Sequence, residues 1–137
     1  MLVIDGENCV LGRLASEVAK KALNGEEIKI MNAEKILIIG NPTQIVEDWK
    51  AKFRIKNVAK PEVGSPKFSR RPDLFVKRSI RGMLPRKSER GKKALKKIKV
   101  FLGKIEGVEK AVKIAEVKDV KRFISVGDLC KQIGWKG

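Results

Sequence analysis

The chain has 137 residues and 42% of them are apolar, which is enough to pack one domain without disulfides or a structural metal. It has no histidine and only two distant cysteines, Cys9 and Cys130, so Ser–His or Cys–His catalysis and a zinc site are excluded. Both cysteines are expected to be buried and reduced. We expect no metal and no cofactor.

No apolar run approaches the roughly 20 residues that a membrane helix needs, so no membrane attachment is expected. The apolar stretch at the N-terminus is too short for a signal peptide, which favours a cytoplasmic location.

The net charge of +16 is concentrated in one segment. Residues 50–99 hold 19 lysines and arginines against three acids, and the other 87 residues hold 13 basic and 13 acidic residues. Such a segment repels itself and favours a polyanionic partner. It lacks a long amphipathic helix with an aromatic face, so the pattern indicates a nucleic acid rather than an anionic membrane.

Hydrophobic periodicity and capping residues predict the elements in chain order. They are a strand at 2–5, a helix at 10–24 stopped by Asn24-Gly25, strands at 28–31 and 36–39, a helix opened by Asn41-Pro42, an extended arm over 54–71, helices at 72–83 and 88–97, and a strand at 99–102. Beyond residue 103 the pattern is ambiguous over 117–126, and Ser125 then caps a short helix.

The strand–helix–strand opening favours an α/β fold with a small, mostly parallel sheet. Only about four residues connect the strands at 28–31 and 36–39, and this link taken alone favours an antiparallel hairpin.

Two features of the sequence could indicate an enzyme, but neither matches an enzymatic motif. Residues 6–14 follow a strand and open a helix, as a phosphate-binding loop does, but the glycine spacing is wrong and Arg13-Leu14 replaces Lys-Ser/Thr. We interpret Gly12 as a close backbone contact at a helix start. Glu34, at the end of the second strand, stands alone as a candidate acid. A small α/β nucleotide-binding enzyme therefore remains an alternative without strong support.

Aromatic residues give two different expectations. Trp49 and Phe53 lie on an apolar helical stripe and are expected in the core. Phe68 and Phe75 interrupt basic runs and are candidates for stacking on an unpaired base.

Several motifs together resemble the archaeal and eukaryotic branch of the large-subunit ribosomal protein L13 family. They cover roughly residues 3–103 in the family's order, and any one alone would be weak. They are Cys9-Val10-Leu11-Gly12-Arg13-Leu14 with the helix that follows, Asn32-Ala33-Glu34-Lys35, Arg70-Arg71-Pro72-Asp73, Arg78-Ser79-Ile80-Arg81-Gly82-Met83-Leu84-Pro85, Lys87 to Arg90-Gly91, and Lys99-Val100-Phe101-Leu102-Gly103.

The resemblance implies a three-layer α/β/α core on a four-stranded parallel sheet, against the hairpin interpretation. It also implies a non-catalytic, ribosome-bound protein that binds large-subunit ribosomal RNA beside other ribosomal proteins and acts early in assembly. A second alternative is a regulatory RNA-binding protein that acts outside the ribosome. We expect one domain over 1–137, with an α/β body at 1–53 and 98–103, a basic arm and helices at 54–97, and a C-terminal extension at 104–137.

We expect the chain to be monomeric when free, with no small-molecule substrate. The residues expected to contact RNA are Arg54, Lys56, Lys67, Arg70, Arg71, Lys77, Arg78, Arg81, Gly82, Arg86, Lys87, Arg90, Gly91, Lys92, Lys93, Lys96 and Lys97. The charged ones would contact phosphates, and Gly82 and Gly91 would let the backbone approach RNA closely.

Overall fold

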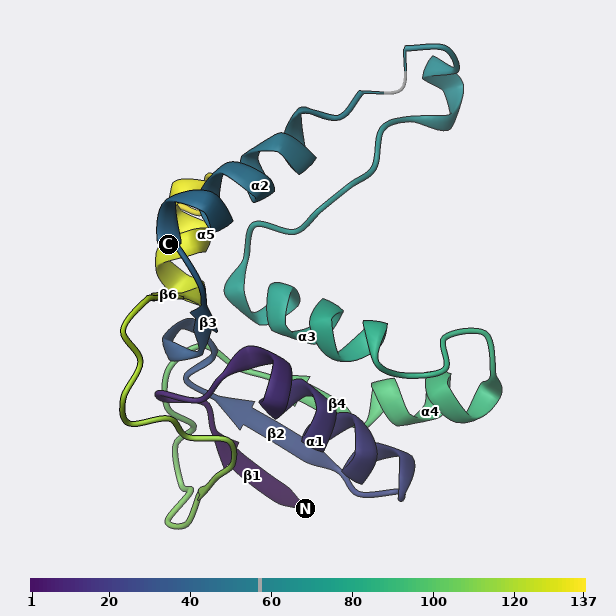
Figure 1. The fold of residues 1–137 in the computed structure, drawn as a ribbon. Coiled ribbons are helices and arrows are strands. Elements are labelled where there is room, and N and C mark those ends of the chain that lie inside the picture. Colours follow the sequence, from purple (N-terminus) through teal and green to yellow (C-terminus); the bar gives the residue numbers. More distant parts are fainter. Residues whose placement is uncertain (57) are drawn as a thin grey trace.

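A computed structural model describes residues 1–56 and 58–137 (Figure 1). The elements in chain order are β1 (Leu2–Asp5), α1 (Leu11–Leu23), β2 (Ile28–Met31), the 3-10 turn η1 (Ala33–Lys35), β3 (Leu37–Ile39), α2 (Pro42–Arg54), the 3-10 turn η2 (Pro61–Val63), α3 (Pro72–Gly82), α4 (Glu89–Lys96), β4 (Ile98–Val100), β5 (Val112–Lys113), β6 (Phe123–Ser125) and α5 (Val126–Gln132). Among the described residues, no helix is long and apolar enough to cross a bilayer.

The main sheet has four parallel strands in the order β4-β2-β1-β5. Ile28 of β2 is in register with Leu2 of β1 on one side and with Ile98 of β4 on the other. Parallel neighbours need crossover connections, and α1 supplies the one between β1 and β2. The predicted α/β class and the four-stranded parallel sheet are confirmed.

The third predicted strand lies outside this sheet. β3 pairs antiparallel with β6, so that Ile38 faces Ile124 in a separate two-stranded sheet. The hairpin interpretation of 28–31 and 36–39 is therefore wrong. Asn32 explains the change of direction, because its left-handed backbone (φ 54°) and the η1 turn carry the chain away from β2.

The extension expected at 104–137 is continuous with the body. Val112 of β5 pairs with Ile4, so this segment supplies the fourth strand of the main sheet. Leu129 and Cys130 of α5 are fully buried in the hydrophobic core. The tail thus completes both the sheet and the core.

The main helices pack against one face of the sheet. The buried cluster on that face joins Ile4, Ile28, Ile30 and Ile98 to Leu14 and Val18 of α1, Val76 and Ile80 of α3, and Ala94 of α4. The alternate residues Val3, Lys29 and Lys99 are half-buried or exposed and stand outside this cluster. The second face carries Val3 and the buried Met31 beside the charged Lys29 and Lys99, so it does not form a continuous apolar surface like the first.

The capping signals in the sequence are confirmed as hydrogen bonds. The Asn41 side chain accepts from the Thr43 N–H at 3.2 Å, and the Ser125 hydroxyl accepts from the Asp128 N–H at 3.2 Å. Gly25 follows α1 with φ 98°, a backbone conformation that suits the stop predicted there.

Candidate nucleic-acid interface

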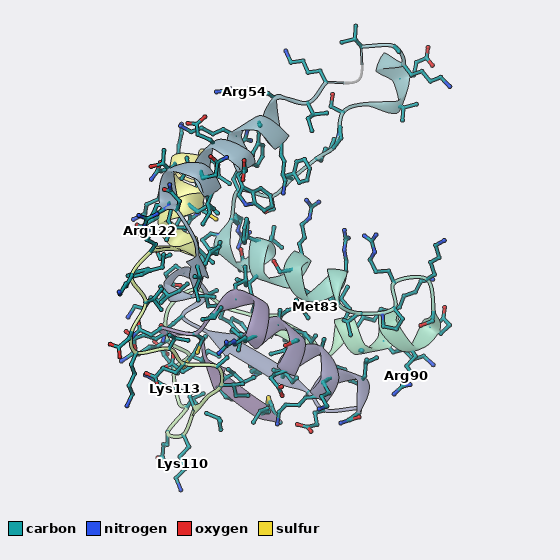
Figure 2. The ribbon with its side chains drawn as sticks, viewed as in Figure 1. Arg54, Met83, Arg90, Lys110, Lys113 and Arg122 are labelled. Atoms are coloured by element: carbon teal, nitrogen blue, oxygen red, sulfur yellow. The ribbon has the colours of Figure 1, made fainter. Side chains whose placement is uncertain are left out.

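The basic residues gather on the long excursion between β3 and β4, which consists of α2, the arm and α3–α4 (Figure 1). In Figure 2, Arg90 lies on α4 at the right of the view and Arg54 lies where α2 runs into the arm. Lys113 and Lys110 of the tail lie at the lower left of the view, and Arg122 lies at the left, where its carbonyl accepts from the Gly40 N–H just before α2. The predicted arm includes residue 57, which lies outside the described residues.

The sequence of the α3–α4 connection builds a cationic hollow. A cavity of about 440 Å³, here called the α3–α4 hollow, is lined by Arg81, Leu84, Arg86, Lys87, Gly91, Lys92 and Leu95. Ser88 fixes its shape, because the hydroxyl caps α4 by accepting from the Gly91 N–H at 3.3 Å. Four cations and two leucines therefore line the same hollow.

Packing inside the protein requires a glycine at position 91. Gly91 is buried, and a β-carbon there would overlap the Pro85 carbonyl oxygen. Gly82 is different, because a β-carbon there would stand in open space. The close approach of the backbone to RNA stays a prediction at both positions.

A second hollow is lined mostly by lysines. This lysine hollow, of about 460 Å³, is lined by Met1, Glu27, Ile28, Lys29, Lys93, Lys96, Lys97 and Lys99. Lys29 comes from β2, outside the basic segment, and it joins the others only because β2 and β4 are adjacent strands. Sequence reasoning did not name Lys29 or Lys99 as contact residues; Lys99 lies inside the basic segment 50–99, but no local signal marks Lys29.

A third hollow lies between α2, the end of the arm and α3. This aromatic hollow, of about 280 Å³, is lined by Trp49, Phe68, Ser69, Phe75, Arg78, Ser79 and Arg81. Arg81 lines both this hollow and the α3–α4 hollow, so the two hollows are neighbours that share this cation. Lys77 instead lines a separate groove with Asp73 and Lys99.

Some predicted RNA contacts are also used inside the chain. Arg70 Nε donates to the Ile133 carbonyl at 2.9 Å, and its guanidinium carbon lies 4.7 Å from the Phe53 ring centroid. This residue therefore links the arm to the segment after α5. Arg71 forms an ion pair with Asp73 at 2.8 Å.

Two basic residues at α4 reach the C-terminal end of α1. Lys97 Nζ donates to the Gly25 carbonyl at 3.0 Å, and an Arg90 guanidinium nitrogen lies 3.5 Å from the Leu23 carbonyl. Cations at this position compensate the partial negative charge of a helix C-terminus. Arg90 and Lys97 thus dock α4 against α1. Lys92 lies 3.7 Å from Glu89 in an exposed ion pair that contributes little stability.

The remaining predicted cations are exposed. They are Arg54 and Lys56 next to the end of α2, Lys67 in the arm, Arg78 and Arg81 on α3, Arg86 and Lys87 in the connection, and Lys93 and Lys96 on α4. Arg78 Nη1 donates to the Lys67 carbonyl at 2.8 Å, which holds the end of the arm against α3.

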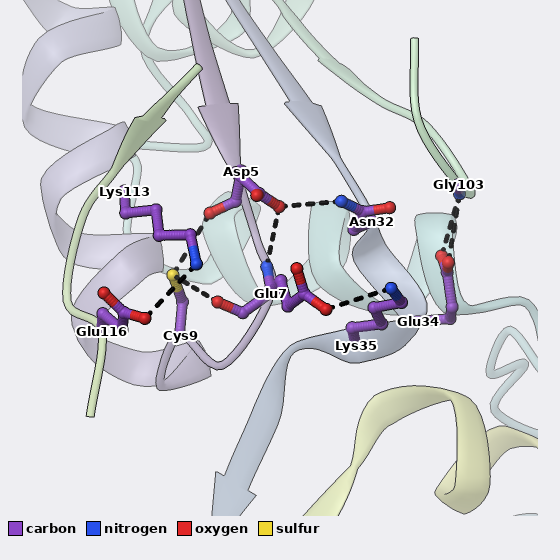
Figure 3. A network of polar contacts seen from close by, with 9 residues as sticks. All are labelled: Asp5, Glu7, Cys9, Asn32, Glu34, Lys35, Gly103, Lys113 and Glu116. Atoms are coloured by element: carbon purple, nitrogen blue, oxygen red, sulfur yellow. Dashed lines mark hydrogen bonds and ion pairs between the residues drawn. The ribbon is translucent and has the colours of Figure 1, made fainter. Parts of the chain in front are cut away.

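The carboxylates at the ends of the strands serve the fold (Figure 3). Glu34 accepts from the Gly103 N–H through both oxygens, at 3.1 and 3.2 Å, and so fixes the segment after β4. Asp5 accepts from the Asn32 side chain at 2.8 Å. Burial raises the pKa of Asp5, but the hydrogen bonds from Asn32 and the Glu7 N–H outweigh it and leave this pKa below its ordinary value.

The glycine-containing loop after β1 is a packing element in this structure. A β-carbon on Gly6 would lie 2.8 Å from Ile36 Cγ1, whereas one on Gly12 would meet nothing within 4 Å. The close backbone contact expected at Gly12 is therefore found at Gly6. Both cysteines are buried, as predicted, and burial raises the pKa of Cys130 to about 12.

Comparison with known proteins shows similarity to the same family that the sequence motifs resemble. The family model for ribosomal protein L13 matches residues 1–106. The chain is similar to the large ribosomal subunit protein uL13 of Methanocaldococcus jannaschii, with 44% identity over 99% of both chains. It is similar to the protein of the same name from Methanococcus maripaludis, with 43% identity over 99% of both chains. The uL13 of Haloarcula marismortui is 34% identical over 97% of this chain and 90% of its own length.

Proposed function

This chain belongs to the ribosomal protein L13 family, and from that premise we propose that it is a structural, non-catalytic component of the large ribosomal subunit, bound to ribosomal RNA. The proposal extends to the contact residues, to neighbouring large-subunit proteins as partners and to a role early in subunit assembly.

The observation that supports this role is the large excess of cations over acids on one excursion of the chain. Residues 50–99 contain three acids, Glu62, Asp73 and Glu89, and two of these are already paired with Arg71 and Lys92. The α3–α4 hollow and the aromatic hollow share Arg81 and lie on this excursion. A solvated surface does not need this density of charge, whereas a folded RNA neutralises it.

The geometry favours recognition of RNA shape. Arginines such as Arg78, Arg81 and Arg86 can hold a phosphate with two parallel hydrogen bonds, while lysines act as mobile point charges. They project from two helices and a connection whose positions are fixed by buried side chains, so their spacing is set before RNA binds. A face of this kind matches the phosphate path of a folded RNA rather than the edges of its bases.

We propose ten direct phosphate contacts. They are Arg54, Lys56, Lys67, Arg78, Arg81, Arg86, Lys87, Lys92, Lys93 and Lys96. Arg70, Arg90 and Lys97 position the arm and α4 through backbone carbonyls and add charge to the same face. With about ten phosphates neutralised, log affinity falls with log salt at a slope of roughly −7 to −9.

The decisive experiment is sedimentation of the tagged protein from its own cell lysate through a sucrose gradient, with a high-salt wash of the fractions. We expect the protein to stay with the large subunit after the wash. Recovery only at the top of the gradient would contradict the proposed role. A salt slope near −2 with purified large-subunit RNA would contradict a broad phosphate-binding face.

A further inference from the structure

We propose that the aromatic hollow between α2 and α3 receives one unstacked base of the bound RNA. This inference rests on the proposed function and goes beyond it, because it assigns one contact to a nucleobase rather than to phosphates. The inference is based on the rings of Trp49 and Phe68 and on the side chains of Arg78 and Arg81, which line the same hollow.

The aromatic side chains form a connected cluster. The Trp49 ring centroid lies 4.7 Å from that of Phe75 and 6.0 Å from that of Phe68, and the Phe68 centroid lies 5.8 Å from that of Phe53. Phe75 is buried and anchors the cluster to the core. Edge-on and tilted contacts of this kind hold the rings in fixed orientations. The hollow therefore has a rigid aromatic floor.

The cluster is not sealed from solvent. Trp49, Phe68 and Ser69 are only half-buried, and the exposed Arg78 and Arg81 line the same hollow. Lys52 Nζ lies 4.1 Å from the Trp49 ring centroid, so a cation already stands against this ring. A ring cluster that served only as core would be covered by apolar side chains. Here the cover is cationic.

This combination matches the chemistry of a nucleotide. A base offers a flat π surface that stacks on aromatic rings and on guanidinium planes, and its flanking phosphates are anions. The hollow offers aromatic rings as a floor and two arginines at the opening. Arg78 is held in place by its bond to the Lys67 carbonyl, so it needs little further ordering to contact a phosphate that flanks the base.

Two hydroxyls add hydrogen-bonding capacity at the same place. Ser79 Oγ donates to the Phe75 carbonyl at 3.2 Å, which leaves its oxygen able to accept. Ser69 Oγ accepts from the Arg71 N–H at 3.3 Å, which leaves its proton able to donate. A donor and an acceptor suit the edge of a base, which presents both. An acidic peptide would use the arginines but leave the aromatic floor without a partner.

The first test uses the unmodified chain. Its affinity is measured for a short single-stranded oligoribonucleotide and for an abasic strand with the same number of phosphates, at one salt concentration. We expect the base-containing strand to bind between about fivefold and about 150-fold more tightly, which is the effect of stacking one base. Equal affinities would overturn the inference.

The second test locates the base. In a Trp135→Phe background, Trp49 is the sole tryptophan, and its fluorescence is expected to be quenched by the base-containing strand and not by the abasic one. Phe68→Leu keeps an apolar side chain but removes the ring, and is expected to bring the affinity ratio close to one. Phe123→Leu, a matched change at a ring that is 45% exposed on β6, should leave the ratio unchanged. The ratio is also measured for Phe68→Leu with Trp135 intact, in case Trp135→Phe impairs folding.

The outcomes separate this inference from the proposed function. If Phe68→Leu keeps the full ratio, the base does not sit in the aromatic hollow. If acidic peptides quench Trp49 and oligonucleotides do not, the hollow is a protein-binding site and the inference fails. In either case a steep salt dependence with structured large-subunit RNA would still support the proposed function. The absence of that salt dependence would overturn both.

Discussion

Replacing Arg78 and Arg81 together by alanine gives the sharpest test of the cationic surface. Both side chains are exposed on α3 and line the aromatic hollow. Each phosphate contact contributes about 0.7 to 0.9 to the slope of log affinity against log salt. The double variant is therefore expected to make that slope shallower by roughly 1.4 to 1.8 and to weaken RNA binding.

The same change should cost little stability. Arg78 donates one hydrogen bond, to the Lys67 carbonyl, and a bond of this kind contributes about 0.5 to 1.5 kcal/mol net. Among the described residues, the Arg81 side chain forms no hydrogen bond or ion pair, and its backbone carbonyl accepts from the Leu84 N–H. At about 4 °C per kcal/mol for a domain of this size, the melting temperature falls by no more than about 6 °C.

The assay is filter binding of a large-subunit RNA fragment over a series of salt concentrations, with thermal melting followed by circular dichroism. The matched control is Lys110→Ala with Arg122→Ala, which removes the same charge from the tail, away from α3 and α4 (Figure 2). The control is expected to leave the slope nearly unchanged. The reasoning is refuted if both variants change the slope equally, or if the α3 variant unfolds.

Three further predictions concern the framework that holds the surface. Gly91→Ala is expected to lower the free energy of unfolding by about 2 kcal/mol or more, because the new β-carbon overlaps the Pro85 carbonyl oxygen. Denaturant titration measures this change, and Gly82→Ala, where a β-carbon meets open space, is the nearly neutral control. Glu34→Gln should cost about 1 to 2 kcal/mol in the same titration, since a charged acceptor for the Gly103 N–H becomes neutral, and a neutral result would argue against this bond. Cys130 is buried and should resist alkylation at pH 8 until the chain unfolds; fast alkylation of the folded chain would contradict this burial. Because its pKa is raised in the folded chain, the neutral thiol contributes stability below about pH 9, and this contribution is lost as the pH rises toward 12.

How much of the fold could be predicted depends on the range of the interactions. Helices α1, α2, α3 and α4 lie within a few residues of their predicted bounds, because periodicity and caps such as Ser88 act over a few neighbouring residues. The choice of strand partners acts over the whole chain. A short link predicted that β3 would pair with β2, and β3 pairs with β6 instead, about 85 residues later in the sequence.

The candidate site likewise has features that the sequence determines and features that depend on the tertiary structure. The sequence by itself determined that residues 50–99 carry the whole net charge, since charge is a sum over residue types and does not depend on folding. Only the tertiary structure decided what each cation faces. It turned Arg70 toward the Ile133 carbonyl, brought Lys29 of β2 beside Lys99 of β4, and set Trp49 and Phe68 under the two arginines of α3. These side chains meet because strands and helices distant in sequence pack on one another to bury apolar surface, and a local pattern carries no information about that choice.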